Sequence, residues 1–440
     1  MKSGRKRLAT LAAVLVFVMV AVSSGVRAGD DQSPAPARLV AYFIEWGIYD
    51  SGYFVKNVLT SGSAERLTHL NYAFANVAPK SVDDSNVVCQ IADSWADYVR
   101  PATVADAVDG VPELYDESVL HGNFNQLRKL KRMFPRLRVF ISLGGFTFSR
   151  YFSDAALTEK SRRTLVKSCV DMFIKGQLPA VSPGGPTVNA AGLFDGIDID
   201  WEWPGNCLDG CMSRPEDKEN FTLLLQEFRR QLDIVGRQHR KRYGLSIFAP
   251  AGVFNIDQMD LASVGRIVDF LTIQGYDLHG GWESSTNFHS ALFSSDDDPA
   301  PTPQFTVDFT VDAYLARGVP ARKIVVGVPF YGRGWSGVPA TNNGLFQPAG
   351  GALPGLVNYH VLKALEASPG WNSFNDPSSN AHWIYNPTTR EFWAFDDPAV
   401  MESKADYVTR RGLGGVMFWD LTGDDGQGTL VKTLDRGLRP

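Results

Sequence analysis

Apolar and polar positions alternate along this chain with two different periods. Eight short runs rich in apolar, β-branched or aromatic residues are separated by stretches in which apolar residues recur every three or four positions. The short runs predict strands, and the longer stretches predict amphipathic helices. The expected strands are residues 39–44, 67–74, 137–142, 193–201, 245–250, 268–276, 324–330 and 415–420, and the expected helices include 123–134, 160–174, 215–240, 307–317 and 398–411.

This regular alternation of strands and helices predicts an α/β fold with a parallel sheet. Eight such units close into a (β/α)8 barrel, the TIM barrel. Two connections are too long to be plain loops. One precedes the first expected helix, and the other, residues 336–394, contains an expected helix at 357–367 and two short expected strands. We therefore expect a small α+β insertion between strands 7 and 8.

Residues 1–28 have the features of a secretory signal peptide. Four basic residues near the start precede an apolar stretch at 8–22, and residues 26–28 form a small-residue cleavage site. The apolar stretch is too short for a membrane span. We therefore expect a secreted, extracellular and soluble protein of residues 29–440, with no membrane partner.

The charge balance limits the class of partner. The chain has 43 Lys and Arg against 48 Asp and Glu, a formal net charge of −5. Removal of residues 1–28 takes away five basic residues and no acidic ones, which makes the net charge −10. This balance disfavours polyanions such as nucleic acid. We expect a monomer.

Four cysteines in a secreted chain permit three pairings. Cys207 and Cys211 belong to one loop, and local closure favours a disulfide between them. Cys89 and Cys169 are then partners or free buried thiols. A zinc site is the alternative, but no nearby His completes a ligand set. We expect no metal and no cofactor.

Residues 194–202 carry the most specific chemistry. Side chains of a strand alternate between its faces, so Asp198, Asp200 and Glu202 share one face while Ile197 and Ile199 share the other. Crowded carboxyls drive their pKa values apart and keep one protonated near neutral pH. Such an acid can protonate a glycosidic oxygen. A solvated strand edge or a cation site is the alternative, but the flanking residues are apolar.

The acidic run resembles the D-x-x-D-x-D-x-E signature of glycoside hydrolase family 18, the chitinases. It extends from Asp195 to Glu202, and the family's S-x-G-G signature is present as Ser142-Leu143-Gly144-Gly145. Further matches run from residues 42–46 to 415–420, and the chain is most similar to bacterial subfamily A. This resemblance implies a chitinase with the insertion beside its substrate cleft.

The resemblance also implies roles for the acids. Family 18 uses the N-acetyl group of the substrate as nucleophile. Glu202 would be the general acid and then the general base, and Asp200 would accept a hydrogen bond from the acetamido N–H. Asp198 would share a proton with Asp200, Tyr276 would hold the acetamido oxygen, and Asp195 is expected to be structural.

The remaining expected site residues bind the sugar chain or support the acids. Tyr42 and Ser142 match residues that hydrogen-bond the inner aspartate. Aromatic planes stack on sugar rings. The full set is Tyr42, Trp46, Ser142, Gly144, Gly145, Gln274, Asp277, Trp282, Tyr331, Arg333 and Trp419. Gln274 stands where the family often has Met, and Phe146 where Trp is common.

Three functions are compatible with this sequence. The first is hydrolysis of chitin, the β-1,4-linked polymer of N-acetylglucosamine. The second is cleavage of another acetamido glycan, and the third is sugar binding without catalysis. The insertion and the cleft aromatics favour chitin, and the presence of Glu202 argues against a silent lectin. The sequence leaves exo or endo attack, processivity and pH optimum open.

Overall fold

The structure, a computed structural model, describes residue 1 and residues 37–81, 84–207 and 210–439. The expected signal peptide and the segment that follows it lie almost entirely outside the described residues. No helix in the described ranges is long and apolar enough to span a membrane. The account below concerns the unit from Ala37 onward.

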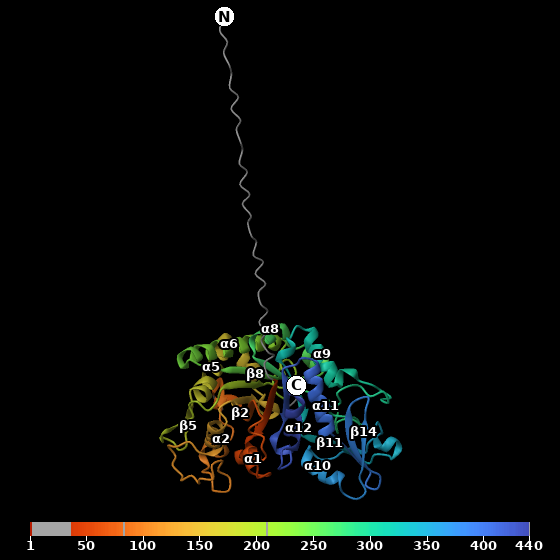
Figure 1. The fold of residues 1–440 in the computed structure, drawn as a ribbon. Helices are drawn as coiled ribbons and strands as arrows, with labels where there is room; N and C mark the ends of the chain where they lie inside the picture. Colours follow the sequence, from red (N-terminus) through yellow and green to blue (C-terminus); the bar gives the residue numbers. More distant parts are fainter. Residues whose placement is uncertain (2–36, 82–83, 208–209, 440) are drawn as a thin grey trace. The chain divides into compact units, whose positions relative to one another are not determined.

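In the described part of the chain, eight parallel strands close into a barrel (Figure 1). Around the barrel each strand pairs with its neighbours, and the first strand closes the ring by pairing with both the second and the last. The strands are β1 (Arg38–Ile44), β2 (His69–Ser81), β4 (Arg138–Gly144), β7 (Gly196–Asp200), β8 (Gly244–Ala249), β9 (Phe270–Ile273), β10 (Ile324–Pro329) and β17 (Gly415–Trp419). The predicted (β/α)8 fold is confirmed.

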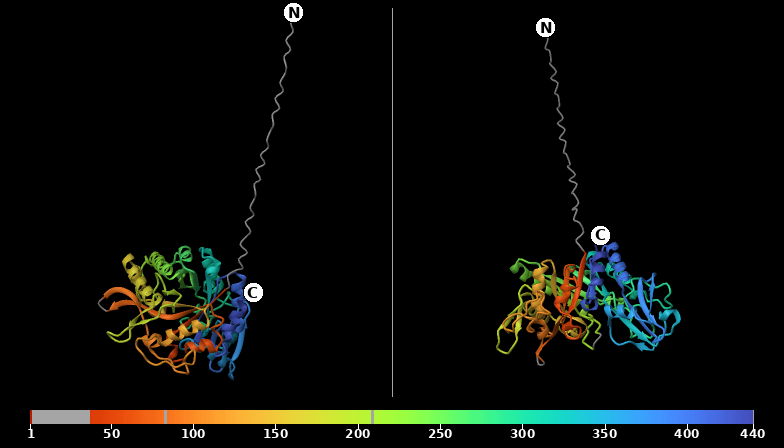
Figure 2. Two further views of the ribbon diagram at one scale, coloured as in Figure 1. Left: turned by 60° about the vertical axis from the view of Figure 1, so that its left-hand side comes forward. Right: turned by 60° about the horizontal axis from the view of Figure 1, so that its bottom comes forward.

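Helices pack around the outside of the strands (Figure 2). They include α1 (Val55–Thr60), α2 (Gly122–Met133), α5 (Glu159–Cys169), α6 (Asp217–His239), α8 (Leu261–Ile267), α9 (Val307–Ala316), α11 (Pro398–Arg410) and α12 (Thr429–Gly437). A large apolar core lies between helices and strands, and a second cluster, which includes Val40, Phe140, Phe270 and Met417, fills the barrel interior. The barrel is therefore a packed scaffold whose strand ends can hold side chains rigidly.

The connection after β2 contains more structure than the sequence pattern predicted. β2 runs on to Ser81 and forms an antiparallel hairpin with β3 (Asp84–Gln90). Cys89 of β3 forms a disulfide with Cys169 at the end of α5, with 5.0 Å between their Cα atoms. This disulfide anchors the hairpin to the helix layer.

The second disulfide joins Cys207 to Cys211 in the loop after β7. Because the acidic run ends immediately before this loop, the disulfide constrains the chain that leaves the strand.

A six-stranded antiparallel sheet lies between β10 and β17 in the sequence. It begins with β11 (Tyr331–Ser336), somewhat earlier than the expected residue 336, and ends with β16 (Glu391–Phe395). The other elements are β12 (Gly351–Ala352), β13 (Val357–Asn358), α10 (Tyr359–Glu366), β14 (Asn372–Asp376) and β15 (Ala381–Asn386). Its own apolar cluster includes Trp335, Trp383 and Phe392. The segment between β10 and β17 thus forms a folded α+β unit.

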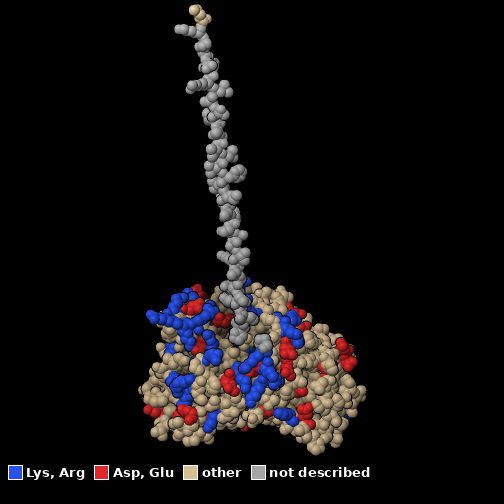
Figure 3. Space-filling view, in the orientation of Figure 1, with Lys and Arg blue, Asp and Glu red and all other residues tan. Residues whose placement is uncertain are grey.

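Charged residues are unevenly distributed over the face drawn in Figure 3. Lys and Arg gather over its upper left and middle together with Asp and Glu, and its lower right has few basic side chains (Figure 3). Many of the charges in the protein form ion pairs, for example Arg242 with Asp269 and Lys241 with Asp195. The drawn face therefore carries mixed charge.

Candidate active site

The innermost acid of the site is Asp198, which is fully buried inside the barrel. Its strand β7 pairs with β4 and β8, so that Ser142 and Ser246 lie directly beside it. The hydroxyls of Tyr42 and Ser142 donate to Asp198 Oδ2 at 2.8 and 2.9 Å, and Ser246 donates to Oδ1 at 2.6 Å. Burial raises the pKa of Asp198, and these three hydrogen bonds oppose the rise.

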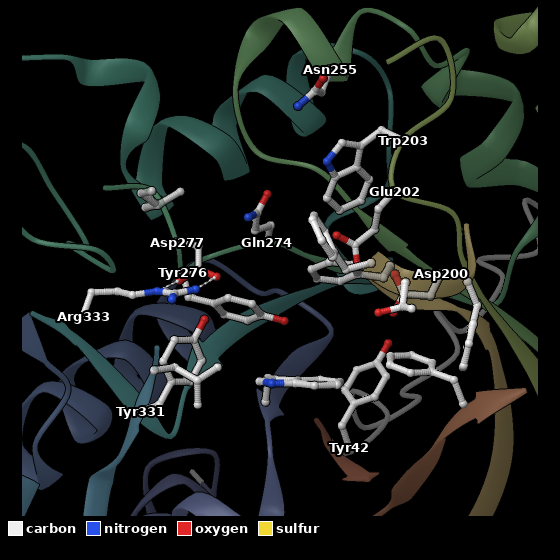
Figure 4. A pocket seen from close by; sticks show the side chains of 18 of the residues that line it. Tyr42, Asp200, Glu202, Trp203, Asn255, Gln274, Tyr276, Asp277, Tyr331 and Arg333 are labelled. Atoms are coloured by element: carbon white, nitrogen blue, oxygen red, sulfur yellow. Dashed lines mark hydrogen bonds and ion pairs between the residues drawn. The ribbon is translucent and has the colours of Figure 1, made fainter. Parts of the chain in front are cut away.

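Asp200 and Glu202 come next along the chain and, unlike Asp198, line the pocket, where Figure 4 labels both side chains. Burial, the charge of Glu202 and that of Asp198 raise the pKa of Asp200 well above its usual range. Asp200 Oδ1 is buried and has no hydrogen-bond donor among the described residues. The surroundings of Asp200 therefore favour its protonated form.

Glu202 is the outermost acid. Burial raises its pKa to about 7, assisted by the charge of Asp277 and opposed by a hydrogen bond from Asp200. Its backbone N–H donates to Ser149 Oγ at 2.9 Å, and the Ser149 hydroxyl lies within hydrogen-bonding distance of the carbonyl of Asp200 at 3.1 Å. Glu202 can therefore both hold and release a proton near neutral pH, as a general acid must.

Asp195 lies apart from this cluster, just before β7 begins. Lys131 and Lys241 pair with it at 2.7 and 2.5 Å, and the backbone N–H of Val139 donates to it at 2.9 Å. These contacts tie the entry of β7 to α2, to β4 and to the loop before β8. Asp195 thus supports the strand and does not reach the pocket.

A pocket of about 1050 Å³ opens over Asp200 and Glu202. The side chains labelled in Figure 4 converge on it from several strand ends. Of the expected site residues, those that line it are Tyr42, Trp46, Asp200, Glu202, Gln274, Tyr276, Asp277, Trp282, Tyr331, Arg333 and Trp419. The tertiary structure thus brings together residues from most of the length of the chain.

Aromatic rings form one side of the pocket. Phe74 and Trp419 stack with ring centroids 5.6 Å apart at 17°, and Trp419 also contacts Tyr42 at 5.2 Å. Trp46 packs against both Phe74 and Trp419 and keeps 40% of its surface exposed. Trp282, 61% exposed, also lines the pocket. Exposed aromatic surface of this kind is suited to the C–H faces of sugar rings.

Tyr276 and Asp277 follow β9, the sixth barrel strand. Tyr276 is buried against Phe248 with ring centroids 6.0 Å apart. Asp277 forms a two-pronged ion pair with Arg333, at 2.7 and 2.8 Å. Burial would raise the pKa of Asp277, but His289 and Arg333 outweigh it and lower that pKa below its usual value. Arg333 also lies over the Trp282 ring, 5.6 Å from its centroid.

Ser142, Gly144 and Gly145 do not line the pocket in this structure. The Ser142 hydroxyl donates a hydrogen bond to Asp198. Gly144 and Gly145 turn the chain at the end of β4, with φ of 108° and 72°. A Cβ on Gly144 would collide with the backbone carbonyl of Asp200, and one on Gly145 would lie 2.6 Å from the Phe74 ring. Both positions need glycine because the chain turns tightly against the acids and the aromatic side.

Sequence reasoning missed several residues that line the pocket. They are Glu45, Phe74, Phe146, Thr147, Phe148, Trp203, Phe248, Asn255, Leu278, Glu283, Phe305 and Leu356. Phe74 and Phe248 fall within expected strands whose last residues face the mouth, so position at a strand end was the available signal. Asn255 and Phe305 lie in connections, where no pattern marked them. Phe146 was singled out in the sequence only because the family commonly has Trp at that position.

No group of three or more His, Cys, Asp or Glu residues in the described ranges is arranged to hold a metal ion. The pocket offers a partly exposed acid with a pKa near 7, a second carboxyl whose pKa is raised well above its usual range, a buried tyrosine and aromatic surfaces.

Comparison with known proteins identifies the family of this chain. The profile of glycosyl hydrolases family 18 matches residues 38–424. Chitinase 63 of Streptomyces plicatus is 34% identical over 418 residues, which cover 93% of this chain and 62% of that protein. The chain spans only 61–62% of the length of the first curated relatives it matches.

Solved structures show the same fold. The catalytic domain of psychrophilic chitinase B from Arthrobacter TAD20 matches with a TM-score of 0.84 and 37% identity, covering 92% of this chain and 95% of that one. A family 18 N-acetylglucosaminidase from Paenibacillus barengoltzii matches with a TM-score of 0.70 and 28% identity, covering 91% and 99%. The resemblance inferred from the acidic strand is confirmed, and this chain belongs to glycosyl hydrolases family 18.

Proposed function

We propose that this chain is a secreted chitinase that hydrolyses β-1,4 bonds between N-acetylglucosamine units. The observation that carries the proposal is the arrangement of three acids, two on β7 and one just beyond its end. Asp198 accepts hydrogen bonds from three hydroxyls, burial and two neighbouring acids raise the pKa of Asp200, and Glu202, whose pKa burial raises to about 7, lines the pocket. The similarity to chitinases over most of the chain supports chitin as the substrate.

In the proposed reaction Glu202 protonates the oxygen of the leaving sugar. The acetamido oxygen of the substrate attacks the anomeric carbon and forms an oxazolinium intermediate, as family 18 chemistry implies. Asp200 accepts a hydrogen bond from the acetamido N–H, which requires its proton to shift toward Asp198. The three hydroxyls around Asp198 support the charge left on this pair.

Tyr276 is proposed to bond the acetamido oxygen and hold it in line for attack. Glu202, now ionised, then takes a proton from water, which opens the intermediate. The configuration at the anomeric carbon is retained because it is inverted twice. Trp419, Trp46 and Trp282 are proposed to stack on successive sugars, and Arg333 and Gln274 to bond their polar groups.

The wider assignment follows from the same proposal. Residues 1–28 would be the signal peptide and residues 29–440 the catalytic barrel, with the insertion at 336–394 forming one wall of the cleft. The protein would act outside the cell as a monomer on chitin and chitooligosaccharides, without a cofactor.

The direct test is the set of products released from chitin and from the hexamer of N-acetylglucosamine, resolved by mass and by time. Dimers and longer products are expected. Release of monomer alone would instead indicate an N-acetylglucosaminidase, and no cleavage of either substrate would refute the proposal.

A further inference from the structure

Two buried carboxyls, Glu45 and Asp97, meet at the aromatic side of the pocket, and the reaction proposed above does not use them. Of the two, only Glu45 lines the pocket. Glu45 begins the short helix η1 (Glu45–Ile48) directly after β1, and Asp97 lies in η2 (Trp95–Val99) of the connection after β2. Their exposed fractions are 5% and 2%. A side-chain hydrogen bond joins them.

The two acids differ in their other partners. The Tyr72 hydroxyl donates to Asp97 Oδ1 at 2.6 Å, and Asn123 Nδ2 donates to the Tyr72 oxygen at 3.1 Å. No N–H or hydroxyl of the described residues donates to the side chain of Glu45, and its Oε2 is buried without a partner. The carboxyl of Asp97 is therefore the group that Glu45 must bond.

Two carboxyls can bond each other only if one of them carries a proton. Burial raises the pKa of Glu45 to about 11, helped by the charge of Asp97, the bond to Asp97 and the charge of Asp93. Burial also raises the pKa of Asp97, to about 7, against the hydrogen bonds from Tyr72 and Glu45. Glu45 is thus the acid that keeps its proton through neutral and mildly alkaline pH.

The other titratable groups around the pair are Asp93, Tyr49, Tyr72 and Tyr98, and no Lys, Arg or His contributes to the pKa of either acid. The described residues also provide no three-ligand cluster for a cation here. A proton is therefore what holds the two carboxyls together.

The link joins two segments that carry exposed tryptophans. Trp46 follows Glu45 directly, and Trp95 lies two positions before Asp97 in η2; the two tryptophans are 40% and 47% exposed. The side chain of Asn123, which also donates to Tyr72, donates a hydrogen bond to the backbone carbonyl of Glu45 at 3.4 Å. Movement of η1 would therefore move the indole of Trp46 relative to Phe74 and Trp419.

We propose that Glu45 and Asp97 form a proton-sharing joint that positions Trp46 along the sugar-binding side of the pocket. Both are positioning residues, because they act through Trp46 and touch no reacting atom. This inference rests on the proposed function, since it assumes that Trp46 contacts the sugar chain. The proposal gives Glu45 a role in the binding of longer sugar chains and no role in cleavage of the glycosidic bond.

The test compares Asp97→Asn with Asp97→Leu on two substrates, the hexamer and a short aryl glycoside that fills only the sites beside Glu202, because Asp97 does not line the pocket. Asn can still hydrogen-bond Glu45 and Tyr72, whereas Leu cannot. Asp97→Leu should raise KM for the hexamer about tenfold, because Trp46 is then no longer held in place for the sugar chain. Its kcat, and both constants for the aryl glycoside, should stay within about twofold of wild type. Asp97→Asn should restore the hexamer KM.

If Asp97→Leu fails to fold, Asp97→Leu/Tyr72→Phe replaces it, because that pair removes the hydroxyl that would otherwise lose its acceptor. An unchanged hexamer KM, an equal loss on both substrates, or an Asn variant as impaired as the Leu variant would overturn the proposed joint. Failure of the wild type to cleave the hexamer would overturn only the proposed function.

An infrared measurement tests the joint independently of activity. The wild-type spectrum minus that of Glu45→Gln at pH 8 should contain the carbonyl band of a protonated carboxylic acid. A difference spectrum that shows only an ionised carboxylate at this position would overturn the proposal.

Discussion

The hydroxyl of Tyr42, on the first barrel strand, donates a 2.8 Å hydrogen bond to Asp198 Oδ2 on β7, although 156 positions separate them in the chain. The hydroxyls of Ser142 and Ser246 also donate to Asp198, so this innermost acid accepts three hydroxyl hydrogen bonds. Asp200, two positions further along the chain, has no hydroxyl donor among the described residues, and burial and the charges of Glu202 and Asp198 raise its pKa well above its usual range. The pKa values of these chemically similar acids therefore differ because the acids accept different numbers of hydrogen bonds.

The substitution Glu202→Gln should lower turnover of chitin oligomers by at least roughly 10² to 10⁴, because it removes the group that protonates the leaving oxygen. Binding of the hexamer, followed by tryptophan fluorescence, should persist. Asp195→Asn is the matched control within the same motif. It should lower the melting temperature through loss of the ion pairs to Lys131 and Lys241 but leave kcat near normal. A Glu202→Gln variant with near-normal kcat would contradict the assignment.

Activity should fall as pH rises through about 7, because Glu202 must be protonated to act as the acid and its pKa lies there. Burial is the main cause of that pKa, and the charge of Asp277 adds to it. Asp277→Asn removes that charge and leaves Arg333 unpaired, and both effects lower the pKa of Glu202. The falling limb of kcat/KM against pH, measured on a short aryl glycoside, should therefore shift to lower pH. A shift to higher pH would refute the electrostatic account.

The first product should be the β-anomer, since attack by the acetamido oxygen and then by water inverts the anomeric carbon twice. Proton NMR of fresh digests, recorded before mutarotation, decides this. Fully deacetylated chitosan should bind to the tryptophans but resist cleavage, because it lacks the nucleophile. An initial α-anomer, or rapid cleavage of the deacetylated polymer, would mean that Asp200 and Tyr276 do not have the proposed roles.

The two disulfides should contribute unequally to stability. Cys89 and Cys169 close a loop of 80 positions and Cys207 and Cys211 one of 4. Chain entropy therefore predicts a loss of about 4 kcal/mol on removing the first disulfide and about 2 kcal/mol on removing the second. Denaturant unfolding of the two double serine variants measures this. Equal losses, or peptide maps in which the four cysteines pair otherwise, would contradict the prediction.

Much of the scaffold could be predicted because it depends on local periodicity. The expected strand at 324–330 is observed as β10 and that at 415–420 as β17, each within one residue at its ends. The β2–β3 hairpin was missed because β2 continues for seven residues beyond the expected end, and these residues include Asn76, Pro79 and Lys80, which interrupt the apolar run. The insertion was expected from 336, but its sheet starts at Tyr331 because β11 follows β10 after a single residue.

The sequence by itself determined which side chains share a face of the acidic strand. Successive residues of a strand point to opposite sides whatever surrounds them, so the row Asp198, Asp200 and Glu202 follows from spacing alone. Only the tertiary structure decided which of these acids keeps its proton, because that depends on hydroxyls from β1, β4 and β8. The meeting of Glu45 with Asp97 likewise had no local signal. Burial and unlike neighbours set a pKa, and both arise only when distant segments pack together.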